Sequence, residues 1–230
     1  QQSSSPVMKD MISPMENTVY FLPNSDARQS QIYFYIPMGD YNREENVRRE
    51  AFNQYISGGF SGLIMNEIRE KNSMAYTAYG FASSCGLPGA QTYFSGYIGT
   101  QNDKAVDAID LYMKLLTDMP ERPGRIDNIK SYLRQSALTD HPDSRNLSLR
   151  IAEWKRRGYT DDPAKKELPL IDSLTFPDIV DYYQKNIKGK PIIIGVLGNP
   201  KDISIDALKK FGKVIRLNEK KLFNEKDTMF

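Results

Sequence analysis

Residues 52–83 read FNQYISGGFSGLIMNEIREKNSMAYTAYGFAS, and this stretch decides much of the expected fold. Its apolar spacing predicts a helix that ends at Gly58 and Gly59, then a second helix, a short turn and a strand. The two glycines let the chain turn sharply and let two helices approach closely. Arg69 falls near the end of the second helix, and Tyr76 opens the strand. We therefore expect both side chains to face one spot at a rigid helix–strand junction.

Hydrophobic periodicity predicts further elements on both sides of this stretch. The expected strands cover 18–22, 29–37, 76–83, 91–100, 191–198 and 213–217. The expected helices cover 43–56, 61–71, 103–119, 176–187 and 205–211, with further helices around 126–133 and 147–154. Asn102 or Asp103 is expected to cap the helix over 103–119.

Strands and helices in this order predict one α+β domain, an antiparallel sheet with helices packed on one face. Residues 1–16 are polar with scattered Met and Pro, and we expect them to form a lead-in or linker. The single domain is expected to cover 17–230. The opening run QQSSSP suggests a piece of a longer polypeptide or a processed chain.

The composition excludes several classes of function. The chain has 230 residues with 40% hydrophobic and 26% charged residues, which is enough for a sizeable core. A net charge of +2 gives no electrostatic argument for nucleic-acid binding. The single cysteine, Cys85, excludes an internal disulfide, and the single histidine, His141, excludes a two-histidine metal site within the chain. No apolar run is long enough for a membrane span.

The run IREKNSMAY at residues 68–76 resembles a stretch of the M16 peptidase family, which includes pitrilysin, insulin-degrading enzyme (insulinase) and the mitochondrial processing peptidases. That stretch, I/L-R-E-K-x-x-x-A/G-Y, occurs in the half of these enzymes that lacks the zinc motif. Other landmarks are similar in order and spacing: QS at 29–30, GGFS at 58–61, the strand over 93–100 before a long helix, and VLG at 196–198. The resemblance covers residues 17–223.

The resemblance implies a LuxS/MPP-like metallohydrolase fold and the non-catalytic, substrate-binding half of a zinc peptidase. In the family, an HxxEH-bearing domain binds the zinc ion, and the two halves close around an unfolded peptide held as an added strand. An Arg and a Tyr of the non-catalytic half reach the peptide site, and the motif places them at Arg69 and Tyr76. This chain would then bind no metal and cleave nothing alone. Family habits favour the periplasm or cell envelope of a bacterium.

Other interpretations stay open at this point. The chain is alternatively an M16-like structural or peptide-binding module with no role in proteolysis. Arg69 alone is typical of a helix end that pairs with carbonyls or a surface acid. Asn72 and Ser73 replace the small, often glycine-containing turn of the family, which leaves the turn geometry open. Cys85 and His141 are expected to be an incidental thiol and a surface-loop histidine.

Tyrosine is abundant, with fourteen residues, and this content suits either a peptide-binding wall or ordinary sheet and surface positions. In the strand over 29–37, the alternation places Ile32, Phe34 and Ile36 on one face and Tyr33 and Tyr35 on the other. Tyr79 and Phe81 likewise share one face of their strand and are expected to pack on the sheet.

Overall fold

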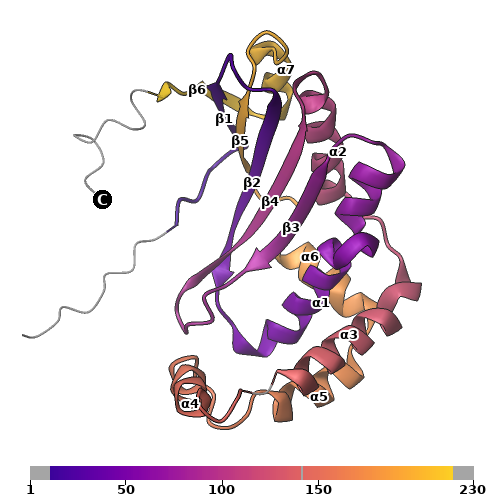
Figure 1. Cartoon of the computed structure of the whole chain (residues 1–230), viewed down its shortest axis with the longest axis vertical. Coiled ribbons are helices and arrows are strands. Elements are labelled where there is room, and N and C mark those ends of the chain that lie inside the picture. The colour runs from indigo at the N-terminus through magenta and orange to yellow at the C-terminus, as the bar shows by residue number, and fades with distance from the viewer. Residues whose placement is uncertain (1–10, 141, 220–230) are drawn as a thin grey trace, which may run out of the picture.

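The computed structural model describes residues 11–140 and 142–219. Its centre is a six-stranded mixed sheet with the strand order β3-β4-β2-β5-β1-β6 (Figure 1). The strands are β1 (Thr18–Pro23), β2 (Gln29–Asp40), β3 (Thr77–Ser83), β4 (Gln91–Gln101), β5 (Ile193–Gly198) and β6 (Lys213–Arg216).

The described residues also form seven α-helices and one π-helix. They are α1 (Asn46–Ser57), η3, the π-helix (Met65–Lys71), α2 (Ala105–Thr117), α3 (Ile126–Thr139), α4 (Leu147–Arg156), α5 (Ala164–Ser173), α6 (Phe176–Asn186) and α7 (Ile205–Leu208). Figure 1 shows α1, α2 and α6 on one side of the sheet, with α3 and α5 farther out.

The expected α+β class with helices on one face is confirmed. The expected antiparallel pairing holds where β2 meets β4 and β5 and where β3 meets β4. The sheet is mixed, however, because β1 runs parallel to both β5 and β6. The direction of β1 depends on where the long helical connections return the chain, and a hydrophobic pattern carries no information on that.

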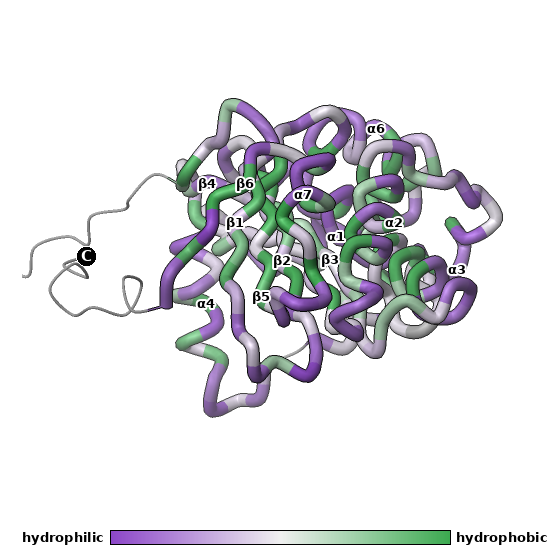
Figure 2. The backbone as a smooth tube through the Cα atoms, turned by 90° about the horizontal axis from the view of Figure 1, so that it is seen from above, coloured by the Kyte–Doolittle hydropathy of each residue, from purple (hydrophilic) through white to green (hydrophobic). Residues whose placement is uncertain are grey.

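The alternation expected for β2 is present, with Ile32, Phe34 and Ile36 buried against the helices. Tyr33 and Tyr35 lie on the opposite, open face and are exposed and half-buried, respectively. In Figure 2, hydrophobic positions gather along the central strands, whereas α3 carries mainly hydrophilic ones. The core therefore lies between one face of the sheet and the inner helices.

Two expectations about the helices need correction. Neither Asn102 nor Asp103 caps α2, whose N-cap position is Lys104 with no capping side chain. Asn102 is instead buried, where its amide accepts a hydrogen bond from Ser30 Oγ at 2.7 Å and donates one to the Ala27 carbonyl at 2.8 Å. The sequence analysis also missed α5, because Pro169 lies inside that helix and reads as a helix breaker.

The remaining expectations concern the N-terminal segment, the residues that the structure does not describe, and membrane spans. From Met11 to Asn17 the lead-in contains no helix or strand. Residues 1–10, His141 and residues 220–230 lie outside the described residues. Across 11–140 and 142–219, none of the helices has the length and apolarity that a membrane span requires.

Tyr112 of α2 is the side chain around which the centre of the fold packs. Its ring stacks on Phe34 of β2 at 4.0 Å between ring centroids, and its hydroxyl donates a hydrogen bond to the Tyr79 carbonyl at 2.9 Å. Gly80 and Gly96 lie opposite each other in the β3–β4 pair, and a Cβ on either would collide with the Tyr112 phenol. Burial raises the pKa of Tyr112 well above its ordinary value, so the hydroxyl remains a donor.

We expect Gly96→Ala to lower the free energy of unfolding by about 1–3 kcal/mol, because the added methyl overlaps the Tyr112 ring and hydroxyl. Tyr112→Phe alone should cost about 1 kcal/mol, the value of one lost hydrogen bond. In a double-mutant cycle measured by urea unfolding, removing the hydroxyl should relieve part of the collision. Strict additivity of the two costs would contradict this packing.

Candidate functional site

Arg69 and Tyr76 line the same open cavity of about 350 Å³, as the sequence led us to expect. The cavity lies where η3 passes through a short turn into β3, beside the end of β4. Its lining comes from two segments and one further side chain: Arg69, Glu70, Ser73 to Tyr76, Thr100, Gln101 and Lys104.

The last turn of η3 holds Arg69 at the cavity. Its neighbour Ile68 is fully buried and anchors the helix in the core. Glu67 forms an ion pair with Arg122 of the connection between α2 and α3, and another with Lys71 at 2.9 Å. Arg69 itself is 45% exposed at the side chain and has a single ion pair, with Glu70 at 3.7 Å, among the described residues. Its guanidinium caps no helix carbonyl there, so it is available to a ligand.

The turn after η3 keeps a backbone conformation that favours glycine. Ser73 has φ of 50°, in the left-handed region that L side chains adopt only occasionally. The Ser73 amide donates to the Arg69 carbonyl, and the Met74 amide donates to the Ile68 carbonyl, both at 2.9 Å. The turn therefore adopts a glycine-type conformation without a glycine.

Tyr76 is fixed at the backbone and half exposed at the ring. Its amide donates to the Gly99 carbonyl of β4 at 2.9 Å, one residue before β3 begins at Thr77. Gln101 donates from Nε2 to the Tyr76 hydroxyl at 3.0 Å. The Tyr76 oxygen thus acts as an acceptor, and its own hydrogen remains free to be donated into the cavity.

Gln101 and Lys104 belong to this site, and the sequence analysis missed both. Lys104 Nζ donates to the Ser73 carbonyl at 3.3 Å and so steadies the turn. The register of the predicted hairpin is the sequence signal that could have placed Gln101 near Tyr76. Because Thr77 pairs with Gly99, extending the antiparallel strands brings Tyr76 beside Thr100 and Gln101.

The cavity offers hydrogen-bond donors and a net positive charge. Arg69 and Lys104 together outnumber the one carboxylate, Glu70. Among the residues that the structure describes, no cluster of three His, Cys, Asp or Glu side chains is placed to hold a metal ion. Cys85 is exposed and lies outside the residues that line the cavity. The arrangement is suited to holding carbonyl oxygens or carboxylates.

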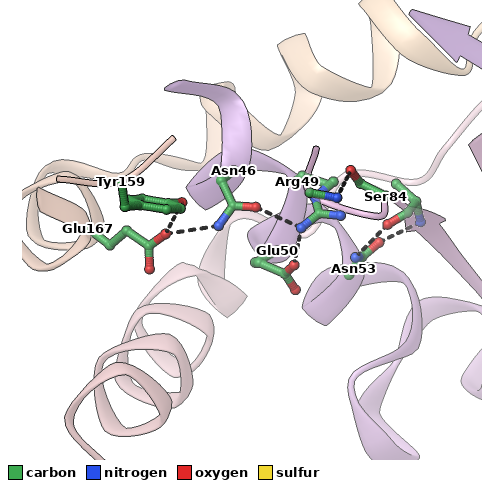
Figure 3. A network of polar contacts seen from close by, with 9 residues as sticks. Asn46, Arg49, Glu50, Asn53, Ser84, Tyr159 and Glu167 are labelled. Carbon is green, nitrogen blue, oxygen red and sulfur yellow. Dashed lines mark hydrogen bonds and ion pairs between the residues drawn. The ribbon is translucent and has the colours of Figure 1, made fainter. Parts of the chain in front are cut away.

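The outer edge of β3 is closed by α1. Asn53 donates from Nδ2 to the Ala82 carbonyl at 3.0 Å and accepts from the Ala82 amide at 2.7 Å, and Ser57 Oγ accepts from the Gly80 amide at 2.8 Å. Figure 3 shows Asn53 beside Ser84 at the end of this strand, on the same helix as Asn46 and Arg49. These side chains satisfy peptide groups that an added strand would need.

Comparisons with known proteins agree on one family. The model described as "Peptidase M16 inactive domain" matches residues 9–123, half of the chain. An uncharacterized zinc protease of Streptomyces coelicolor is 27% identical over 162 residues, covering 66% of this chain and 33% of that protein. The chain thus spans about a third of this curated relative.

Solved structures show the same fold at low sequence identity. A peptidase M16 inactive domain from Pseudomonas fluorescens superposes with a TM-score of 0.66 at 15% identity, over 85% of this chain and 47% of that one. The periplasmic protease PqqL from Escherichia coli superposes with a TM-score of 0.64 at 16% identity, over 86% of this chain and 22% of that one.

Because Ser73 occupies the left-handed region, Ser73→Gly should raise the free energy of unfolding by a few tenths to about 1 kcal/mol. Ser73→Val should lower it by about 1 kcal/mol or more, since a β-branched residue tolerates this conformation poorly. Urea unfolding of both variants tests the prediction. A matched exposed position, Ser136 of α3, controls for the loss of a hydroxyl, and there glycine should destabilise the helix.

Proposed function

Because this chain belongs to the M16 peptidase family as its inactive domain, we propose that it is the non-catalytic, substrate-binding half of an M16-type zinc peptidase. Residues 17–230 form this half, and an HxxEH-bearing domain, in the same polypeptide or a separate subunit, forms the other. The substrate is an unfolded peptide held between them. The observation that carries the proposal is that Arg69 and Tyr76 line one cavity.

Each side chain has a role that fits its chemistry. A zinc ion bound by the partner domain would supply Lewis-acid chemistry at the scissile carbonyl. Tyr76 donates its free hydroxyl hydrogen to the carbonyl oxygen as negative charge develops there. Arg69 holds neighbouring peptide carbonyls or a carboxylate in place through the donors of its guanidinium. Neither role requires a metal ligand or a nucleophile from this chain.

The closed edge of β3 limits how a peptide is held in this half. Strand addition needs free peptide groups along an edge, and Asn53 and Ser57 occupy those of Ala82 and Gly80. A peptide that added as a strand here would therefore meet peptide groups of Gly80 and Ala82 that are already bonded. This half then contacts the peptide through side chains, from Arg69 and Tyr76 outward.

We expect Tyr76→Phe to reduce kcat of the complete peptidase by roughly 10²–10³-fold, the usual cost of one lost oxyanion donor. Arg69→Ala should reduce kcat/KM, with a larger share in KM because it removes a contact to the bound peptide. The measurement is cleavage of a quenched fluorescent peptide library by the protein assembled with its HxxEH-bearing partner.

Arg134→Ala on α3 is a matched control, because its side chain is 50% exposed and does not line the cavity. This control should leave turnover unchanged. If Tyr76→Phe and Arg69→Ala also leave turnover unchanged in a folded assembly, the chain is a structural or peptide-binding module without a role in proteolysis.

Gln101 provides a sharper test of the Tyr76 role. In Gln101→Glu, the carboxylate can only accept, so it takes the hydroxyl hydrogen that Tyr76 would otherwise give to the substrate. We expect kcat to fall about tenfold or more, with little change in KM. Gln101→Ala leaves that hydrogen free and should have the smaller effect. The reverse order of the two variants would contradict the assigned direction of this hydrogen bond.

A further inference from the structure

A row of aromatic rings crosses the open face of the sheet, the face that points away from the helices. Phe81 stacks on Tyr79 at 6.1 Å between ring centroids, Tyr79 contacts Tyr97 at 5.3 Å, and Tyr97 contacts Tyr33 at 5.1 Å. We call these four residues the aromatic row. It runs from β3 over β4 to β2, across the strand direction. Three of its members, Tyr33, Tyr79 and Phe81, are 51%, 39% and 39% exposed.

The face around the aromatic row is uncharged. Strands β3, β4 and β5 contain no charged residue, and β2 contains none from Gln31 to Pro37, although 26% of the whole chain is charged. A charged ligand group placed there would lose water without gaining a partner. The face is therefore suited to uncharged and apolar groups.

The tyrosines combine ring surface with unused hydroxyls. Within the described residues, the hydroxyls of Tyr79 and Tyr97 have no hydrogen-bond partner, and Tyr33 donates to Gln31 Oε1 at 3.5 Å. Burial, and after it the phenols of Tyr33 and Tyr79, raise the pKa of Tyr97, so its hydroxyl stays protonated and can donate. Rigid tyrosine rings provide contact area at low entropic cost, while their hydroxyls adapt to different peptide groups.

The aromatic row continues directly from the cavity that holds Arg69 and Tyr76. Two strand pairs lie between Tyr76 and the first ring pair, Tyr79 and Tyr97: the small pair Thr77–Gly99, and Ala78–Ile98, which is buried on the helix side. Three strand residues correspond to about 10 Å, so an extended peptide in the cavity reaches the row within about three residues.

The row also reaches the edge of the sheet, because Tyr79 and Phe81 belong to the edge strand β3. Tyr79 and Phe81 line a surface hollow of about 430 Å³ together with Tyr132 of α3. The cavity, the aromatic row and this hollow together form an uneven surface. Such a surface can be followed by a flexible peptide more easily than by the flat surface of a second domain.

We propose that the aromatic row is a specificity subsite that selects peptides with uncharged aromatic or aliphatic side chains about three to five residues from the scissile bond. This inference rests on the proposed function and adds the class of substrate. Backbone carbonyls of the peptide accept from the free tyrosine hydroxyls, and its apolar side chains lie between the rings.

The test is peptide binding to the complete protein with its zinc ion chelated, so that no cleavage occurs. The probes are two fluorescein-labelled peptides of alanine, serine and glycine, one carrying two adjacent phenylalanines and the other two adjacent aspartates. By fluorescence anisotropy, we expect the phenylalanine peptide to bind about tenfold more tightly.

Variants of the aromatic row then test whether it causes the preference for the phenylalanine peptide. The double variant Tyr79→Ser/Tyr97→Ser should abolish it, and Tyr79→Phe/Tyr97→Phe should keep most of it because the rings remain. Leu149→Ser on α4 removes an exposed apolar side chain elsewhere and should change nothing. Thermal unfolding of each variant checks that the fold is retained.

Equal affinity for the two peptides, or a preference that survives the double serine variant, would overturn the proposal. So would a double serine variant that weakens domain assembly in gel filtration and leaves peptide preference intact, because a protein domain then covers the face. Turnover is measured separately, with zinc restored. Full turnover in Arg69→Ala and Tyr76→Phe would reject the proposed proteolytic role but not the specificity subsite, because the binding preference is measured without cleavage.

Discussion

The close approach of Tyr112 to the sheet is the constraint on which the rest of the structure depends. Two glycines, Gly80 and Gly96, face each other in the β3–β4 pair and leave the space that its phenol fills. The hydroxyl then bonds to the backbone of β3, and the ring stacks on Phe34 of β2. One side chain thus joins α2 to three strands, and it fixes the spacing between the helices and the sheet.

The candidate site depends on this arrangement because it lies at the end of the same two strands. Tyr76 continues β3, Gln101 ends β4, and Lys104 immediately precedes α2. The π-helix η3 brings Arg69 to them through a turn that is tied at both ends by backbone hydrogen bonds. Wider i→i+5 turns often occur at functional sites, where they re-aim side chains at the cost of regular helical bonding. The donors Arg69 and Tyr76 are therefore held by rigid elements, and their side chains are about half exposed.

The sequence predicts most of the secondary structure, the burial of Ile32, Phe34 and Ile36, and the convergence of Arg69 and Tyr76, because each follows from local periodicity or short spacing. Features that depend on contacts between distant residues could not be predicted from the sequence. The parallel direction of β1 depends on a return path of many residues, and the buried role of Asn102 depends on Ser30 and Ala27, far away in the chain. The fold of α5 around Pro169 likewise follows from tertiary packing that a local signal opposes.

The two surfaces of β3 explain how one strand can serve recognition without inviting aggregation. An exposed strand edge pairs readily with other chains, and here side chains of α1 already bond its peptide groups. The open face of the same strand carries Tyr79 and Phe81, which offer contact area without free peptide groups. A ligand on this face is consequently held by ring contacts and single hydroxyl bonds. Such contacts fix no register along the strand, so they tolerate different sequences while still discriminating by polarity.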